Sequence, residues 1–135
     1  FAQSLGAAAS RVQFFGRRSR AEFIELIAAC DVLLDPFPVG GGISTWDALA
    51  TGTPIVTLPG AAMRSRFAAF ALEQAALPAS IATDADGYAQ IVQRLAGSCD
   101  EREHWRDRMR TACDAIYRDT RAVDAWVAEV MRLVG

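Results

Sequence analysis

Short continuous apolar runs alternate along the chain with stretches in which apolar residues recur every three or four positions. Three runs predict β-strands, with a fourth, short edge strand as an addition: Val12–Phe15, the DVLLD segment at 31–35, Ile55–Leu58 and Ser80–Ala82. The helical stretches between them are about ten residues long, a spacing that predicts right-handed βαβ units and a parallel sheet. The expected fold class is therefore α/β, a Rossmann-like parallel sheet flanked by helices.

Capping and stop signals predict where the helices begin and end. Ser19 precedes Glu22 at the spacing of a capping box, so a helix is expected from here to about Cys30. Ser44 or Thr45 is expected to cap the next helix, which Gly52 ends. Further helices are expected over residues 64–76, 86–96 and 101–117 and after Thr120, and the end of another over Phe1–Ala9.

The composition excludes several classes of function. A formal net charge of -2 provides no basic field for nucleic acid or an anionic membrane, and no apolar run is long enough to span a bilayer. Three widely spaced cysteines and one histidine predict reduced thiols and no metal site. No signal peptide is visible, so we expect a cytoplasmic protein.

Three or four strands are fewer than a doubly wound sheet usually contains. We therefore expect that part of the sheet, and a partner domain, lie upstream of Phe1. The truncated sheet edge and the apolar face of the last helix, which carries Val123, Trp126 and Val127, are surfaces on which a homo-oligomer could form. The apolar face of this helix is expected to be exposed.

The loop Pro36–Gly42 is the strongest candidate for chemistry, because ligands of open parallel sheets bind at the carboxyl ends of the strands. Its three consecutive glycines let the backbone approach an anion closely. The following helix points free N–H groups and its positive dipole end into the same space, which suits a phosphate or pyrophosphate. Asp47 lies about one turn into this helix, where its carboxylate can accept hydrogen bonds from two ribose hydroxyls.

The same residues also admit a structural interpretation. Ser44 would then be an N-cap with Asp47 as its capping-box partner, and residues 40–42 would be a flexible turn. A glycine-rich loop between strand and helix does not by itself decide between the two. Asp84–Asp86 has the DxD pattern of a metal motif, but its place at a helix start favours capping.

Two groups of arginines follow predicted strands. Arg17, Arg18 and Arg20 are either a solvated helix start or, through Arg20, a contact to a nucleotide. Arg64 and Arg66 contact either a diphosphate or the missing domain, or they form surface ion pairs.

A resemblance to a known family lies in the segment DVLLDPFPVGGGISTWDALATGTPIVTLPGAAMRSR. This segment resembles the C-terminal catalytic lobe of the O-linked N-acetylglucosamine transferase family, which includes bacterial tetratricopeptide-linked relatives and bacterial N-glucosyltransferases. The resemblance extends from about Arg11 to Leu95, and more loosely to the end. It implies a GT-B fold, in which residues 1–135 belong to the C-terminal nucleotide-sugar-binding domain and residues 98–135 are a helical extension.

The resemblance also implies a set of donor-binding residues. Asp47 matches the ribose-binding Asp of the family, and Phe23 stands where a ring can pack on uracil. The remaining matches are Gly41, Gly42, Ile43 and Ser44 for the diphosphate, Arg20 for the nucleotide, and Arg66 beside the cleft. The animal enzymes have two threonines at the positions of Ile43 and Ser44 and a histidine at Gly42, so here the backbone must bind more of the phosphate.

The implied function is that of the UDP-sugar-binding lobe of an inverting, metal-independent glycosyltransferase. It would transfer GlcNAc or a hexose from UDP-GlcNAc or UDP-glucose to a protein acceptor. No catalytic residue is assigned, because the general base is expected in the absent lobe, and Asp35 is given a structural hydrogen-bonding role. The chain alone is expected to be inactive. A non-catalytic glycosyltransferase-like interaction domain and a UDP-sugar epimerase lobe are the alternatives.

Overall fold

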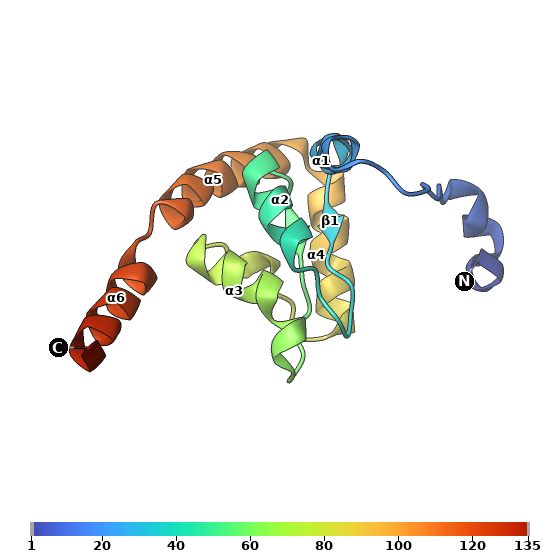
Figure 1. Cartoon of the computed structure of the whole chain (residues 1–135). Coiled ribbons are helices and arrows are strands. Elements are labelled where there is room, and N and C mark those ends of the chain that lie inside the picture. Colours follow the sequence, from blue (N-terminus) through green and yellow to red (C-terminus); the bar gives the residue numbers. More distant parts are fainter. Residues whose placement is uncertain (1, 135) are drawn as a thin grey trace.

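The structure is a computed structural model and describes residues 2–134, so Phe1 of the predicted first helix lies outside it. Six α-helices and two short strands are present in this part of the chain (Figure 1). In order along the chain they are α1 (Arg20–Ala29), β1 (Leu33–Leu34), α2 (Ile43–Thr51), β2 (Ile55–Val56), α3 (Phe67–Gln74), α4 (Ala85–Gly97), α5 (Cys99–Tyr117) and α6 (Arg121–Val134). Short 3₁₀ helices are η1 (Ala2–Arg11), η2 (Met63–Ser65) and η3 (Pro78–Ser80).

The sheet is parallel, as predicted, but small. Leu33 lies opposite Ile55 and Leu34 opposite Val56. A parallel bridge between Thr57 and Ile81 adds a third chain segment on the other side of β2, at the position of the predicted edge strand.

The predicted strand Val12–Phe15 is wrong, because these residues are irregular and exposed. A strand needs a neighbouring strand to be stable, and within residues 2–134 this segment takes part in no β-ladder or β-bridge. Within residues 2–134, β1 is therefore an edge strand paired only with β2, and its Leu34 remains 50% exposed.

The core is formed around α2. This helix packs against α1, α3 and α5, and its Leu49 is fully buried together with Ile55 of β2 and Met109 of α5. Burial of such a side chain stabilises the fold by roughly 1.5–3 kcal/mol. At the end of α2, Gly52 has a φ of 75°, and an added Cβ would lie 3.1 Å from a backbone carbonyl of α5. Glycine therefore ends the helix as predicted and also allows α5 to cross closely.

The helix-start signals were largely accurate. Ser19 and Glu22 form the expected capping box, with the Ser19 amide donating to Glu22 Oε2 at 2.8 Å. Ser98 caps α5, which therefore begins two residues before the predicted position 101. The predicted helix over 64–76 is divided into η2 and α3, because Arg66 has a φ of −119° and a ψ of −1° between them.

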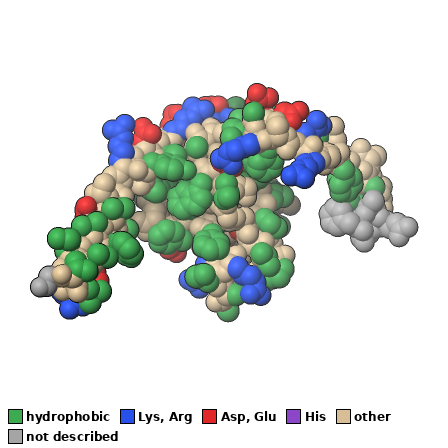
Figure 2. All heavy atoms as spheres, in the orientation of Figure 1, with side chains coloured by type: hydrophobic (Ala, Val, Ile, Leu, Met, Phe, Trp, Pro, Cys, Tyr) green, Lys and Arg blue, Asp and Glu red, His purple; other side chains and the backbone are tan. Residues whose placement is uncertain are grey.

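The N-terminal arm and α6 extend from opposite sides of the body (Figure 1). None of the residues of α6 with described side chains is buried, and Trp126 in its apolar face is 72% exposed, in line with the expected exposure. Figure 2 shows hydrophobic side chains along this helix and on the adjoining face of the body. No helix within residues 2–134 combines the length and the apolar character needed to cross a membrane.

Candidate functional site

The loops that follow β1 and β2 meet at the carboxyl ends of these strands. The amide of Gly40 donates to the carbonyl of Arg64 at 3.2 Å, which joins the loop after β1 to η2 in the loop after β2. Within the second loop, the Gly60 amide donates to Ser65 Oγ at 3.1 Å. The two loops therefore lie together at the carboxyl edge of the sheet, where ligands of open parallel sheets bind.

Asp35 links the glycine loop to the sheet. Its side chain follows β1, the residue is only 6% exposed, and Oδ1 accepts a hydrogen bond from the Gly41 amide at 2.6 Å. The other oxygen, Oδ2, accepts from Thr57 Oγ1 at 2.7 Å. The structural hydrogen-bonding role predicted for Asp35 is confirmed.

A second contact at the end of β1 was not predicted from the sequence. Tyr88 of α4 donates its hydroxyl to the backbone carbonyl of Asp35 at 3.2 Å. Burial, and to a smaller extent the charge of Asp35, raise the pKa of Tyr88, so its hydroxyl keeps its proton and remains a donor. The two residues are 53 positions apart, and no local pattern marks the pair.

The three glycines differ in their surroundings. A Cβ added to Gly40 would lie 2.9 Å from Asp35 Oδ2, and one added to Gly41 would lie 2.6 Å from Ser44 Oγ. A Cβ added to Gly42 would meet no atom within 4 Å. Gly40 and Gly41 therefore allow the loop to pack on itself, whereas Gly42 borders open space.

The start of α2 differs from the prediction. Its N-cap is Gly42, not Ser44 or Thr45, and no side chain caps it. The hydroxyl of Thr45 instead donates back to the carbonyl of Gly41 at 3.0 Å, which places Ser44 and Thr45 inside the first turn. In the described residues 2–134, the amides of Gly42, Ile43 and Ser44 have no acceptor, so three N–H groups and the positive end of the helix dipole are available.

Asp47 does not form the capping box that the structural interpretation required. Its carboxylate is held by Arg20 from the first turn of α1, with Nη2 2.7 Å from Oδ1 and Nη1 3.4 Å from Oδ2. The Asp47 side chain is 9% exposed, while that of Arg20 is 65% exposed. A carboxylate has about four lone-pair positions, so a two-point contact with Arg20 leaves acceptors for further hydroxyl groups. Phe23 lies one turn beyond Arg20, and its ring is 39% exposed.

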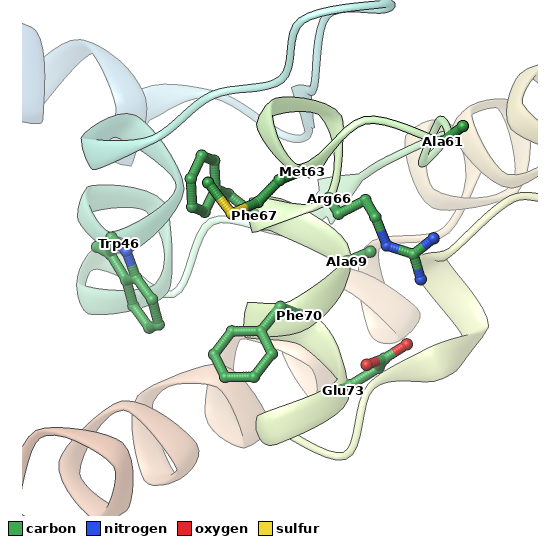
Figure 3. A pocket seen from close by; sticks show the side chains of 8 residues that line it. All are labelled: Trp46, Ala61, Met63, Arg66, Phe67, Ala69, Phe70 and Glu73. Carbon is green, nitrogen blue, oxygen red and sulfur yellow. The ribbon is translucent and has the colours of Figure 1, made fainter. Parts of the chain in front are cut away.

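Arg66 lies in a different place. It lines a cavity of about 730 Å³ between α2 and α3 (Figure 3), and no contact within residues 2–134 joins it to Arg20 or Asp47. Figure 3 shows the rings of Trp46, Phe67 and Phe70 around this cavity, with Arg66 and Glu73 together at another side. The structure therefore assembles Arg20, Asp47 and the glycine loop, and leaves Arg66 in a separate, largely aromatic setting.

The remaining candidates are the DxD segment, the cysteines and His104, and none of them belongs to the site formed by Arg20, Asp47 and the glycine loop. Asp84 caps α4 by accepting from the Gly87 amide at 2.7 Å, as predicted for the DxD segment. Within residues 2–134, no group of three or more His, Cys, Asp or Glu side chains could hold a metal ion. Within residues 2–134, Cys30, Cys99 and Cys113 form no disulfide, and His104 is exposed on α5.

The comparison with known proteins agrees with the resemblance seen in the sequence. A model of glycosyl transferase family 41 matches residues 1–121 of the 135-residue chain. The chain belongs to glycosyl transferase family 41. It is 30% identical over 100 residues to a UDP-N-acetylglucosamine--peptide N-acetylglucosaminyltransferase from Caenorhabditis elegans. This match covers 74% of the chain and 9% of that relative.

A solved structure confirms the fold of the family 41 chain. A mutant of the O-GlcNAc transferase of Thermobaculum terrenum superposes with a TM-score of 0.84 at 24% sequence identity. The match covers 96% of the family 41 chain but only 25% of the solved chain. The chain therefore spans a small part of the length of both relatives, and its fold is that of one portion of an O-GlcNAc transferase.

Proposed function

We propose that this chain is the donor-binding lobe of a glycosyltransferase that transfers a sugar from a UDP-sugar to a protein. The observation that supports this most directly is the juxtaposition of free amides at the start of α2 with a buried carboxylate, Asp47, held in place by Arg20. Phosphate groups bind at such helix starts, and a carboxylate one turn further is placed to accept ribose hydroxyls. We propose further that the whole enzyme has a GT-B fold, lies in the cytoplasm and inverts the anomeric centre of the sugar without a metal.

Each part of the donor has a proposed counterpart. The amides of Gly42, Ile43 and Ser44 would bind the diphosphate, since they lack acceptors within the described residues and Gly42 faces open space. Asp47 would bind the ribose, and the half-exposed ring of Phe23 would pack on uracil. UDP-GlcNAc and UDP-glucose both fit this proposal, because the proposed roles concern the diphosphate, the ribose and the uracil, which the two donors share.

The chemical contribution of the chain would be stabilisation of the leaving group. Negative charge grows on the β-phosphate as the bond to the sugar breaks, and prearranged N–H groups and a helix dipole stabilise it without a proton transfer. Arg66 would act at the edge of the cleft, in the cavity shared with Trp46. We place the general base and the protein acceptor in parts of the enzyme outside this chain, which alone would be inactive.

The ribose role of Asp47 can be tested by calorimetry on the full-length protein. Asp47→Ala should weaken UDP binding by about 1–3 kcal/mol, because charge-assisted hydrogen bonds to the ribose are lost. The loss should shrink for 2′-deoxy-UDP and be small for pyrophosphate, which lacks the ribose. Asp107→Ala, an exposed change on α5, is the matched control.

The outcome also separates the alternatives. An unchanged UDP dissociation constant for Asp47→Ala would reject the ribose role. Full-length protein that binds no UDP, by saturation-transfer NMR, would support a non-catalytic interaction domain instead. Interconversion of UDP-GlcNAc and its epimer without transfer to protein would support an epimerase lobe.

A further inference from the structure

The carboxylate of Asp35 is buried at the base of the glycine loop. Within residues 2–134, Asp35 forms no ion pair, yet it is 6% exposed. Burying an ionised carboxylate costs several kcal/mol unless hydrogen bonds offset the loss of water. Its side chain accepts hydrogen bonds from the Gly41 amide in the loop and from the Thr57 hydroxyl just after β2. Both hydrogen bonds therefore hold the loop against the ends of the strands.

We propose that Asp35 is the positioning residue that shapes the glycine loop for the diphosphate of the donor. The proposal rests on the donor-binding function proposed above and adds a division of labour within the loop. The amides of Gly40 and Gly41 point inward, to the Arg64 carbonyl and to Asp35. The next three amides, from Gly42 to Ser44, are left for the ligand.

The carboxylate of Asp35 lies so close to the loop that side chains at positions 40 and 41 would crowd it. Oδ1 of Asp35 lies 2.6 Å from the Gly41 nitrogen, which is shorter than an ordinary N–H···O hydrogen bond. A Cβ on Gly40 would lie 2.9 Å from Oδ2 and 3.3 Å from Oδ1. Asp35 and these two glycines therefore act as one unit, in which the glycines let the backbone close onto the carboxylate.

Thr57 fixes the orientation of that carboxylate. It is fully buried just after β2, and its hydroxyl donates to Oδ2 at 2.7 Å, which leaves Oδ1 directed at Gly41. The loop after β1 is thereby tied to the end of the neighbouring strand. Movement of the carboxylate would move the start of α2, where the free amides lie.

The test uses the full-length protein with Asp35→Ala, Asp35→Asn and Thr57→Val. Asparagine retains an oxygen for the Gly41 amide and offers an N–H to the Thr57 hydroxyl, so it keeps the geometry without the charge. Asp35→Ala should weaken binding of UDP and of pyrophosphate about tenfold or more, and binding of uridine by less than about threefold. Asp35→Asn should bind UDP within about threefold of wild type, and Thr57→Val should fall between the two variants.

Hydrogen exchange without ligand provides a second readout. Asp35→Ala should exchange faster than wild type in peptides covering residues 36–44, and Asp35→Asn should not. The proposal is overturned if Asp35→Ala binds UDP like wild type, if it weakens uridine as much as UDP, or if Asp35→Asn is as weak as Asp35→Ala. Wild-type protein that binds no UDP would reject the proposed function and the diphosphate role together, and the exchange rates would then decide only whether Asp35 shapes the loop.

Discussion

Gly42→Ala separates the stability of the lobe from its proposed binding function. The substitution adds one methyl group at the N-cap of α2, where the backbone has a φ of −97° and a ψ of −91°. The added Cβ meets no atom within 4 Å, so no packing is disturbed. We expect the free energy of unfolding to fall by only about 0.5–1 kcal/mol, the difference between glycine and the poorer N-cap alanine.

Donor binding should respond quite differently. The methyl group would project into the space in which we place the diphosphate, beside the free amides of Gly42 and Ile43. Displacing the ligand from one such amide forfeits a hydrogen bond to a charged group, which is worth about 1.5–3 kcal/mol, or roughly tenfold or more in the UDP dissociation constant.

Gly40→Ala is the matched control for the loop. Its Cβ would lie 2.9 Å from Oδ2 of the buried Asp35, and such overpacking typically costs about 1–3 kcal/mol of stability. Thermal unfolding and UDP calorimetry on the full-length protein should therefore show Gly40→Ala as the more destabilised variant, and Gly42→Ala as a folded variant whose main defect is weak UDP binding. Normal UDP affinity in Gly42→Ala would refute the position assigned to the diphosphate, and an unchanged melting temperature in Gly40→Ala would refute the packing argument.

Two further predictions concern the framework around the site. Gly52→Ala should lower the free energy of unfolding by about 1–3 kcal/mol, because a φ of 75° is unfavourable for alanine and the added Cβ would crowd a carbonyl of α5. Denaturant titrations would measure this loss, and an unchanged midpoint would contradict the prediction. The amide and hydroxyl of Ser19 lower the pKa of Glu22 below 4.5, so its contribution is present above that pH and disappears as the pH falls through the lowered value. The melting temperature of Glu22→Gln should then depend less on pH below 4.5 than that of wild type, and identical pH profiles would rule the effect out.

The features that the sequence predicted correctly are those determined within a few residues. The capping box of Ser19 and Glu22, the stop at Gly52 and the cap at Asp84 each depend on one turn of backbone. The alternation of strands and helices likewise predicted a parallel pairing of β1 with β2. The family was also identified from one continuous segment, because the residues and the spacing that mark it lie close together in the sequence.

The errors arise where distant residues or competing bonds decide. The run Val12–Phe15 has a strand pattern but takes part in no β-ladder or β-bridge of the described chain, and a strand pattern alone does not supply a neighbouring strand. The start of α2 moved to Ile43 because the Thr45 hydroxyl bonds back to the loop and does not act as a cap. Arg20 and Asp47 were each expected at the nucleotide, but their direct pairing across 27 positions was not foreseen.

The charges around the proposed diphosphate site explain why the loop geometry carries so much of the proposal. Arg20 is already paired with Asp47, and Arg66 lies in the cavity beside Trp46. Asp35 adds a negative charge beneath the loop, and Ile43 has no polar side-chain atom to offer. An anion at this position would be met mainly by backbone N–H groups and a helix dipole equivalent to about half an elementary charge. Such donors cannot reorient as an arginine side chain can, so small shifts of the loop should matter more to donor binding than the loss of any single cation of this chain.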